Sequence, residues 1–151
     1  MEKERYELKD IDKAIVFEFT SIGPKGEIPK LVIYTKTNNA RVYNLAFGDK
    51  DINTGDIDDL VITDNKDSPK VLATVASTIY AFTKRHPRAF VFVKGSTKAR
   101  TRLYQIGISN NLAEITTDFA VLGEKEGTWE HFERNRAYDA FLITLKKNVN
   151  G

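Results

Sequence analysis

The stretch AFVFVKGSTKARTRLYQIG, residues 89–107, predicts a buried strand that turns directly into a helix. Its first five residues, AFVFV, are an unbroken aliphatic and aromatic run, typical of a strand covered on both faces. Lys94 and Gly95 end this strand. Ser96 or Thr97 can then cap the helix, because either hydroxyl can accept a hydrogen bond from a free backbone N–H of the first turn. A strand–turn–helix unit is therefore expected at the centre of the fold.

The predicted helix has an apolar face and a basic side. Ala99, Leu103 and Ile106 recur at spacings of four and three, which places them on one face. Arg100 and Arg102 lie off that face. Because a helix N-terminus offers unpaired N–H groups and the positive end of the helix dipole, the neighbouring cations favour binding of phosphate or carboxylate. The residues predicted to bind an anion or nucleic acid are Lys94, Ser96, Thr97, Lys98, Arg100, Arg102 and Tyr104.

Other interpretations of this stretch stay open. The basic side chains can equally be a solvated face that pairs with acidic neighbours. Tyr104 can stack on a ligand or pack against the sheet. The Gly-Ser-Thr-Lys run lacks the two-glycine spacing of a phosphate-binding loop, which excludes that nucleotide-hydrolase motif.

Length and composition indicate one globular domain over residues 1–151, with a charged and loosely held segment at residues 1–10. The chain has no cysteine, which excludes disulfides, thiolate metal sites and a cysteine nucleophile. Lys and Arg number 23 against 21 Asp and Glu, so the net charge is +2 and any basic site must be local. We find no signal peptide and no apolar run that could span a bilayer, so a cytoplasmic protein without membrane contact is expected.

The first half of the chain has a strand pattern. Four strands are predicted, AIVFEFTS, KLVIYTK, RVYNLAF and LVIT, at residues 14–21, 30–36, 41–47 and 60–63. Short turns between the strands favour an antiparallel meander, because parallel neighbours need long crossover connections.

The loop GDKDINTGDIDD, residues 48–59, carries Asp49, Asp51 and Asn53 at the spacing of an EF-hand calcium loop. Gly55 stands one place too late, no Glu closes the loop, and a strand precedes it where an EF-hand has a helix. Asp, Asn and Gly are also the residues that turns prefer. An acidic solvated hairpin is the favoured interpretation, and cation binding between Asp49 and Asp59 is left open.

A long helix is predicted from Pro69 to Arg85, capped by Asp67 or Ser68. Its apolar stripe is Val71, Leu72, Val75, Ile79 and Phe82. His86 is expected to be a surface residue rather than a catalytic base. Further on, residues 109–111 either cap a short helix or bend the preceding one. A hairpin around residues 125–127, with Trp129 as a packing or stacking residue, and a last strand in YDAFLITLKK complete the chain.

Together these elements predict an α+β fold, a largely antiparallel twisted sheet with helices on one face. The order of a four-strand meander and a long helix is similar to the repeat of whirly and Pur-alpha-like single-stranded nucleic-acid-binding folds. Such a likeness in element order does not establish function.

Four blocks carry a family resemblance: KVLATVASTIYAFTKRHP, GSTKARTRLYQIGIS, YNLAFGDKDINTGDIDDL and TWEHFERNRAYDAFLI. They begin at Lys70, Gly95, Tyr43 and Thr128 and together cover nearly the whole chain. In these blocks the chain resembles a family of small proteins of unknown function found mostly in Bacteroidetes. The resemblance implies a single small bacterial domain, and it supplies no activity.

Three functional hypotheses follow. The first is a non-enzymatic module that binds a phosphate-bearing ligand or single-stranded nucleic acid, with Lys84 and Arg85 extending the basic surface and Tyr104 or Trp129 stacking. The second is a protein-interaction module of a bacterial regulatory or toxin–antitoxin pair. Separately, exposed sheet edges favour a homodimer. The third is an acyl-transferase-like enzyme in which Tyr104 supplies a proton. No cofactor, metal or catalytic residue is predicted, because no nucleophile, base and orienting group can be placed together.

Overall fold

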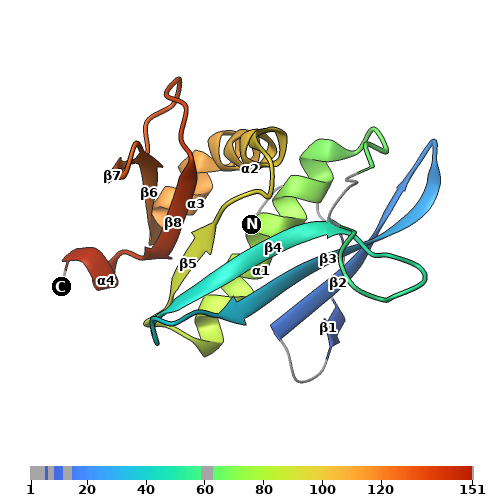
Figure 1. Cartoon of the computed structure of the whole chain (residues 1–151), viewed down its shortest axis with the longest axis horizontal. Coiled ribbons are helices and arrows are strands. Elements are labelled where there is room, and N and C mark those ends of the chain that lie inside the picture. The colour runs from blue at the N-terminus through green and yellow to red at the C-terminus, as the bar shows by residue number, and fades with distance from the viewer. Residues whose placement is uncertain (1–5, 7–8, 12–14, 59–62, 151) are drawn as a thin grey trace.

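The computed structural model describes residues 6, 9–11, 15–58 and 63–150, whose strands form one sheet in the order β1-β2-β3-β4-β5-β8-β6-β7 (Figure 1). The strands are β1 (Lys9–Ile11), β2 (Ile15–Gly23), β3 (Gly26–Lys36), β4 (Val42–Asp49), β5 (Phe90–Val93), β6 (Phe119–Lys125), β7 (Thr128–His131) and β8 (Ala140–Leu145). The helices are α1 (Ser68–Arg85), α2 (Lys98–Asn110), α3 (Leu112–Asp118) and α4 (Lys147–Asn150).

Every neighbouring pair of strands is antiparallel except β4 and β5, which run parallel. The connection between these two strands contains α1, as a parallel pair requires a crossover. α1, α2 and α3 lie on the same side of the sheet (Figure 1). The predicted α+β class, with a largely antiparallel sheet and its main helices on one face, is confirmed.

The N-terminal meander is present in β2, β3 and β4, and β1 adds a strand that the sequence did not predict. Residues 60–62 of the predicted fourth strand lie outside the described residues, and Thr63 is not in a strand. Tyr6, from the segment expected to be loosely held, is fixed on the fold. Its backbone N–H donates to Thr74 Oγ1 at 2.7 Å, and its hydroxyl donates to Asp67 Oδ2 at 2.5 Å.

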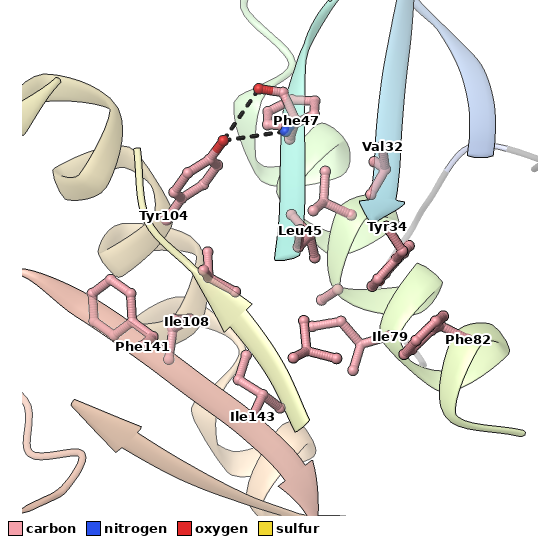
Figure 2. Close-up of a cluster of buried hydrophobic side chains, with 14 of the residues drawn as sticks. Val32, Tyr34, Leu45, Phe47, Ile79, Phe82, Tyr104, Ile108, Phe141 and Ile143 are labelled. Atoms are coloured by element: carbon pink, nitrogen blue, oxygen red, sulfur yellow. Dashed lines mark hydrogen bonds between the residues drawn. The ribbon is translucent and has the colours of Figure 1, made fainter. Parts of the chain in front are cut away.

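The core lies between the sheet and α1. The predicted stripe of α1 is buried throughout, which confirms that helix, and Pro69 lies in its first turn. Tyr34 stacks on Phe82 with ring centroids 4.2 Å apart (Figure 2). The Tyr34 hydroxyl shares a 2.7 Å hydrogen bond with Thr78 Oγ1. Burial raises the pKa of the Tyr34 phenol far above its ordinary value.

The buried face of α2 differs from the predicted one. Thr101, Tyr104, Gly107 and Ile108 face the core. Of the predicted face, Leu103 packs half-buried against the core, whereas Ala99 is exposed and Ile106 keeps 44% of its surface accessible. Two of the inward residues are polar and one is glycine, so apolar spacing could not identify them. Their place is set by tertiary contacts, because a Cβ on Gly107 would lie 3.2 Å from Leu72 Cδ2.

The C-terminal elements agree with the sequence. α2 stops at Asn110, and the buried Asn111 donates from its side-chain amide to the Gly107 carbonyl at 2.7 Å before α3 begins. The predicted hairpin joins β6 and β7, with both turn residues, Glu126 and Gly127, at positive φ. Such a pair of residues matches the twist that a two-residue hairpin needs. β8 then returns between β5 and β6.

Candidate anion-binding surfaces

The loop between β5 and α2 is wound tightly onto the start of the helix. Thr97 is the N-cap, and its Oγ1 accepts a hydrogen bond from the Arg100 N–H at 3.1 Å. The Gly95 N–H donates to Thr101 Oγ1 at 3.0 Å. A Cβ on Gly95 would lie 2.4 Å from the Thr101 nitrogen, so only glycine permits this approach. The local strand–turn–helix prediction is therefore correct, with Thr97 rather than Ser96 as the cap.

Five of the residues predicted to bind an anion face solvent: Lys94, Ser96, Thr97, Lys98 and Arg102. Arg100 is half-buried, and its Nη2 donates to the Asp58 carbonyl at 2.9 Å, so this guanidinium holds the loop after β4. Lys94, Lys98 and Arg102 form no ion pair with a described residue. We call these three side chains the α2 surface.

Tyr104 is not available to a ligand on that surface. It is 7% exposed, its oxygen accepts a hydrogen bond from the Phe47 N–H, and its hydroxyl donates to the Phe47 carbonyl, both at 3.2 Å (Figure 2). Burial is the main cause that raises the pKa of this phenol. Packing against the sheet is therefore the correct interpretation of Tyr104, and its predicted stacking role is wrong.

Lys84 and Arg85 do not extend the α2 surface. α1 ends at Arg85 just before β5 begins, whereas α2 starts just after β5 ends. The four residues of β5 separate the two helix ends by about 13 Å along the strand. The sequence predicts one continuous basic surface, but Lys84 and Arg85 lie at one end of β5 and the α2 surface lies at the other.

A larger basic cluster surrounds Lys84 and Arg85. Arg41 Nε donates to the Arg88 carbonyl at 3.0 Å, and its guanidinium lies 5.2 Å from the centre of the Phe90 ring. Asn148 Nδ2 donates to the Pro87 carbonyl at 2.9 Å, which brings the segment after β8 to the same place. We call this cluster the basic end. It comprises six exposed side chains, Arg41, Lys84, Arg85, Arg88, Lys146 and Lys147.

The segments that form the basic end contain no carboxylate. Residues 36–41, 84–88 and 146–150 read KTNNAR, KRHPR and KKNVN. Residues 49–67 include most of the acidic loop and contain seven aspartates. They begin at the C-terminal end of β4, whereas Arg41 precedes its N-terminal end. The small net charge of +2 therefore conceals a separation of charge along the sheet. The sequence alone does not reveal this cluster, because its members are distant in the chain.

The acidic loop uses its oxygens within the protein. Asp49 is buried and forms an ion pair with Lys30, which is 1% exposed, and its Oδ2 accepts the Thr63 N–H at 3.0 Å. Asp51 Oδ1 accepts the N–H of Asn53 at 2.8 Å, a turn stabilised by its own side chain. Within the described ranges, no three His, Cys, Asp or Glu residues gather as a metal site would require.

The remaining aromatic candidates have packing partners. His86 lies 4.9 Å from Phe82 and 5.3 Å from Tyr43, measured between ring centroids. Trp129 is half-buried and meets Phe92 edge-on, with the centroids 6.3 Å apart.

Among the described helices, none has the length and apolar character needed to cross a membrane.

Comparison with known proteins gives one match. A model of a family of unknown function, DUF6934, matches residues 2–146. No curated protein and no solved structure is detectably similar to this chain.

Proposed function

The chain belongs to DUF6934, a family of unknown function, and from its charge distribution we propose that it is a non-enzymatic module that binds the phosphate backbone of nucleic acid. The observation that supports this proposal is the basic end, where six exposed cations meet and the contributing segments carry no acid. Clustered Lys and Arg on one face are the electrostatic footprint of nucleic-acid binding. The absence of cysteine agrees with a reducing bacterial cytoplasm as the setting.

The chemistry of the basic end suits phosphate. Arg88 and Arg85 offer planar guanidinium groups that can meet two phosphate oxygens at once, and the lysines add compact charges. Because all six side chains are exposed, phosphate oxygens can reach them from solvent. The α2 surface, with Lys94, Lys98 and Arg102, is a second and smaller contact that the same strand could reach only by passing along the sheet.

The test compares two triple variants that each remove three charges. Lys84→Gln/Arg88→Gln/Lys147→Gln alters the basic end, and Lys94→Gln/Lys98→Gln/Arg102→Gln alters the α2 surface. Fluorescence anisotropy of a labelled single-stranded oligonucleotide, titrated at several salt concentrations, measures both. We expect the first variant to bind much more weakly and its slope of log affinity against log salt to fall by about 2, since each phosphate contact on a single strand contributes about 0.7.

Three outcomes would contradict this assignment. Equal losses in the two variants would mean that net charge, not the basic end, controls binding. A loss confined to the α2 variant would place the contact where the sequence alone predicts it. No binding by the wild-type protein at low salt would remove the nucleic-acid proposal altogether.

A protein-interaction module is the second candidate, and the sheet face opposite α1 favours it. On that face Asn44, Phe92, Leu142 and Leu122 form one row across four adjacent strands, and all of them are half-buried. Three of the four, Phe92, Leu142 and Leu122, are apolar, and partly exposed apolar side chains next to one another on a sheet suit a surface that meets another protein. A second copy of the chain is one such partner. The Tyr104 hydroxyl, which would supply the proton of an acyl-transferase, is buried and donates to the Phe47 carbonyl, which argues against that third hypothesis.

A further inference from the structure

A cavity of about 1200 Å³ lies beside α1, next to the basic end. Its walls are one side of α1, the junction of α3 with β6, and the end of β8. Its volume is larger than the roughly 300–1,000 Å³ typical of ligand pockets. The described residues that line it are Tyr6, Ser77, Tyr80, Ala81, Thr83, Lys84, Thr117, Asp118, Phe119, Leu145, Lys146 and Lys147.

Three cations lie on the wall of this cavity that faces the basic end. Lys84 comes from the last turn of α1, and Lys146 and Lys147 follow β8. The Lys146 N–H donates to the Asp118 carbonyl at 3.1 Å, which fixes the backbone of this wall. All three lysines are exposed, and none forms an ion pair with a described residue. They are therefore able to meet the oxygens of a phosphate group.

The rest of the wall suits a flat, partly polar group. Tyr80 packs edge-on against Phe119, with ring centroids 4.9 Å apart, and its hydroxyl donates to the Glu114 carbonyl at 3.1 Å. This rigid aromatic pair offers apolar surface. The Asp118 carboxylate and the Thr117 hydroxyl oxygen, both exposed, can accept hydrogen bonds from amino groups. Cations on one wall, and aromatic surface with acceptors on another, match the phosphate and the base of a nucleotide.

We propose that this cavity binds an unpaired nucleotide, with its phosphate on Lys84, Lys146 and Lys147 and its base beside Tyr80 and Asp118. The inference rests on the proposed function, because the three lysines belong to the basic end. It also narrows that function to single strands or strand ends. A base inside a duplex is stacked and paired, and it cannot enter a cavity unless it is first extruded.

A cavity-filling substitution tests the proposal without changing charge. Ala81 lines the cavity at a half-buried position of α1, and Ile52 is 94% exposed in the acidic loop, outside both basic surfaces. Ala81→Trp and the control Ile52→Trp are compared by anisotropy with a single strand and with a duplex of the same sequence. We expect Ala81→Trp to lower single-strand affinity at least about tenfold, as loss of one stacked base would, and to leave duplex affinity unchanged. Ile52→Trp should leave both affinities unchanged.

A second variant tests the proposal even if Ala81→Trp does not fold. Lys84→Gln/Lys147→Gln keeps the packing of α1, and calorimetry measures its binding of a nucleoside 5′-monophosphate, the corresponding nucleoside and inorganic phosphate. The variant should lose affinity for the monophosphate, and in the wild type the monophosphate should bind more tightly than either of the other two probes. Far-UV circular dichroism confirms that each variant is folded.

The proposal and the function it rests on can fail separately. If single strands and duplexes bind equally and Ala81→Trp affects neither, the cavity proposal is wrong and backbone binding at the basic end stands. If inorganic phosphate binds as tightly as the monophosphate, the cavity recognises phosphate alone and the assignment of a base is overturned. If no oligonucleotide or nucleotide binds at low salt, both proposals fall.

Discussion

At the scale of single residues, the buried pair of Lys30 and Asp49 holds the end of the acidic loop. Lys30 Nζ donates to the Thr63 carbonyl at 2.9 Å, and Asp49 Oδ2 accepts the Thr63 N–H at 3.0 Å. The pair therefore binds both backbone groups of one residue as the chain returns toward α1. A buried ion pair adds little net stability over an apolar pair, but the loss of one partner leaves the other charge uncompensated.

A double-mutant cycle tests this pair. We expect Lys30→Met alone to lower the free energy of unfolding by roughly 3–5 kcal/mol, because Asp49 stays buried without its cation. Lys30→Met/Asp49→Leu should lose less than the sum of the single losses, by about 0.5–3 kcal/mol. Urea denaturation measures each value.

The partly exposed pair of Lys50 and Glu18, with Nζ and Oε1 2.9 Å apart, is the control. Its Lys50→Met change should cost no more than about 1 kcal/mol. Strictly additive losses at Lys30 and Asp49 would contradict the role assigned to the buried pair.

At the scale of elements, the start of α2 depends on one hydroxyl. Thr97 and Ser96 are adjacent and chemically alike, yet only the Thr97 oxygen accepts a hydrogen bond from the first turn. Both side chains are exposed, so the two positions differ in capping and not in burial.

The pair Thr97→Ala and Ser96→Ala therefore isolates the cap. Thr97→Ala should destabilise the protein by roughly 0.5–2 kcal/mol, the cost of an unpaired N–H at a helix start. Ser96→Ala should change stability by no more than about 0.5 kcal/mol. Thermal unfolding followed by circular dichroism measures both, and equal shifts in midpoint temperature would exclude Thr97 as the specific cap.

The sequence could predict α1 more fully than α2 for a physical reason. α1 covers the sheet with aliphatic and aromatic residues at helical spacing, so the residue types alone identify its buried face. In α2 the buried polar residues are Thr101, whose hydroxyl accepts a hydrogen bond from the Gly95 N–H, and Tyr104, which forms hydrogen bonds with the Phe47 backbone. These inward polar residues have partners that lie elsewhere in the chain, which a periodicity argument cannot see.

At the scale of the whole molecule, the parallel pair of β4 and β5 joins two halves of the sheet. The N-terminal strands end at β4, and the C-terminal strands begin at β5. Four residue pairs, from Val42 with Phe90 to Leu45 with Val93, form this seam. α1 lies over the seam and shares the core of both halves, so neither half buries its apolar face without the other.

We therefore expect the chain to unfold as one cooperative unit. Fluorescence of the single tryptophan, Trp129, reports β7 at one edge, and far-UV circular dichroism reports the whole sheet and helices. The two urea transitions should coincide. Val91→Ala, at a fully buried site in β5, should shift both by the same amount, a loss of about 2 kcal/mol. Separate transitions would show that the two halves unfold independently.

The sequence by itself determined the α+β class, the meander, the long helix α1, the strand–turn–helix unit and the final hairpin. Each of these rests on periodicity, turn residues or caps, which act between near neighbours in the chain. Only the tertiary structure decided where the charges gather. The sheet carries Lys84 and Lys94, ten positions apart in the chain, to opposite ends of β5. It brings Arg41, Arg88 and Lys147 to one end, because the strand order fixes which distant segments meet.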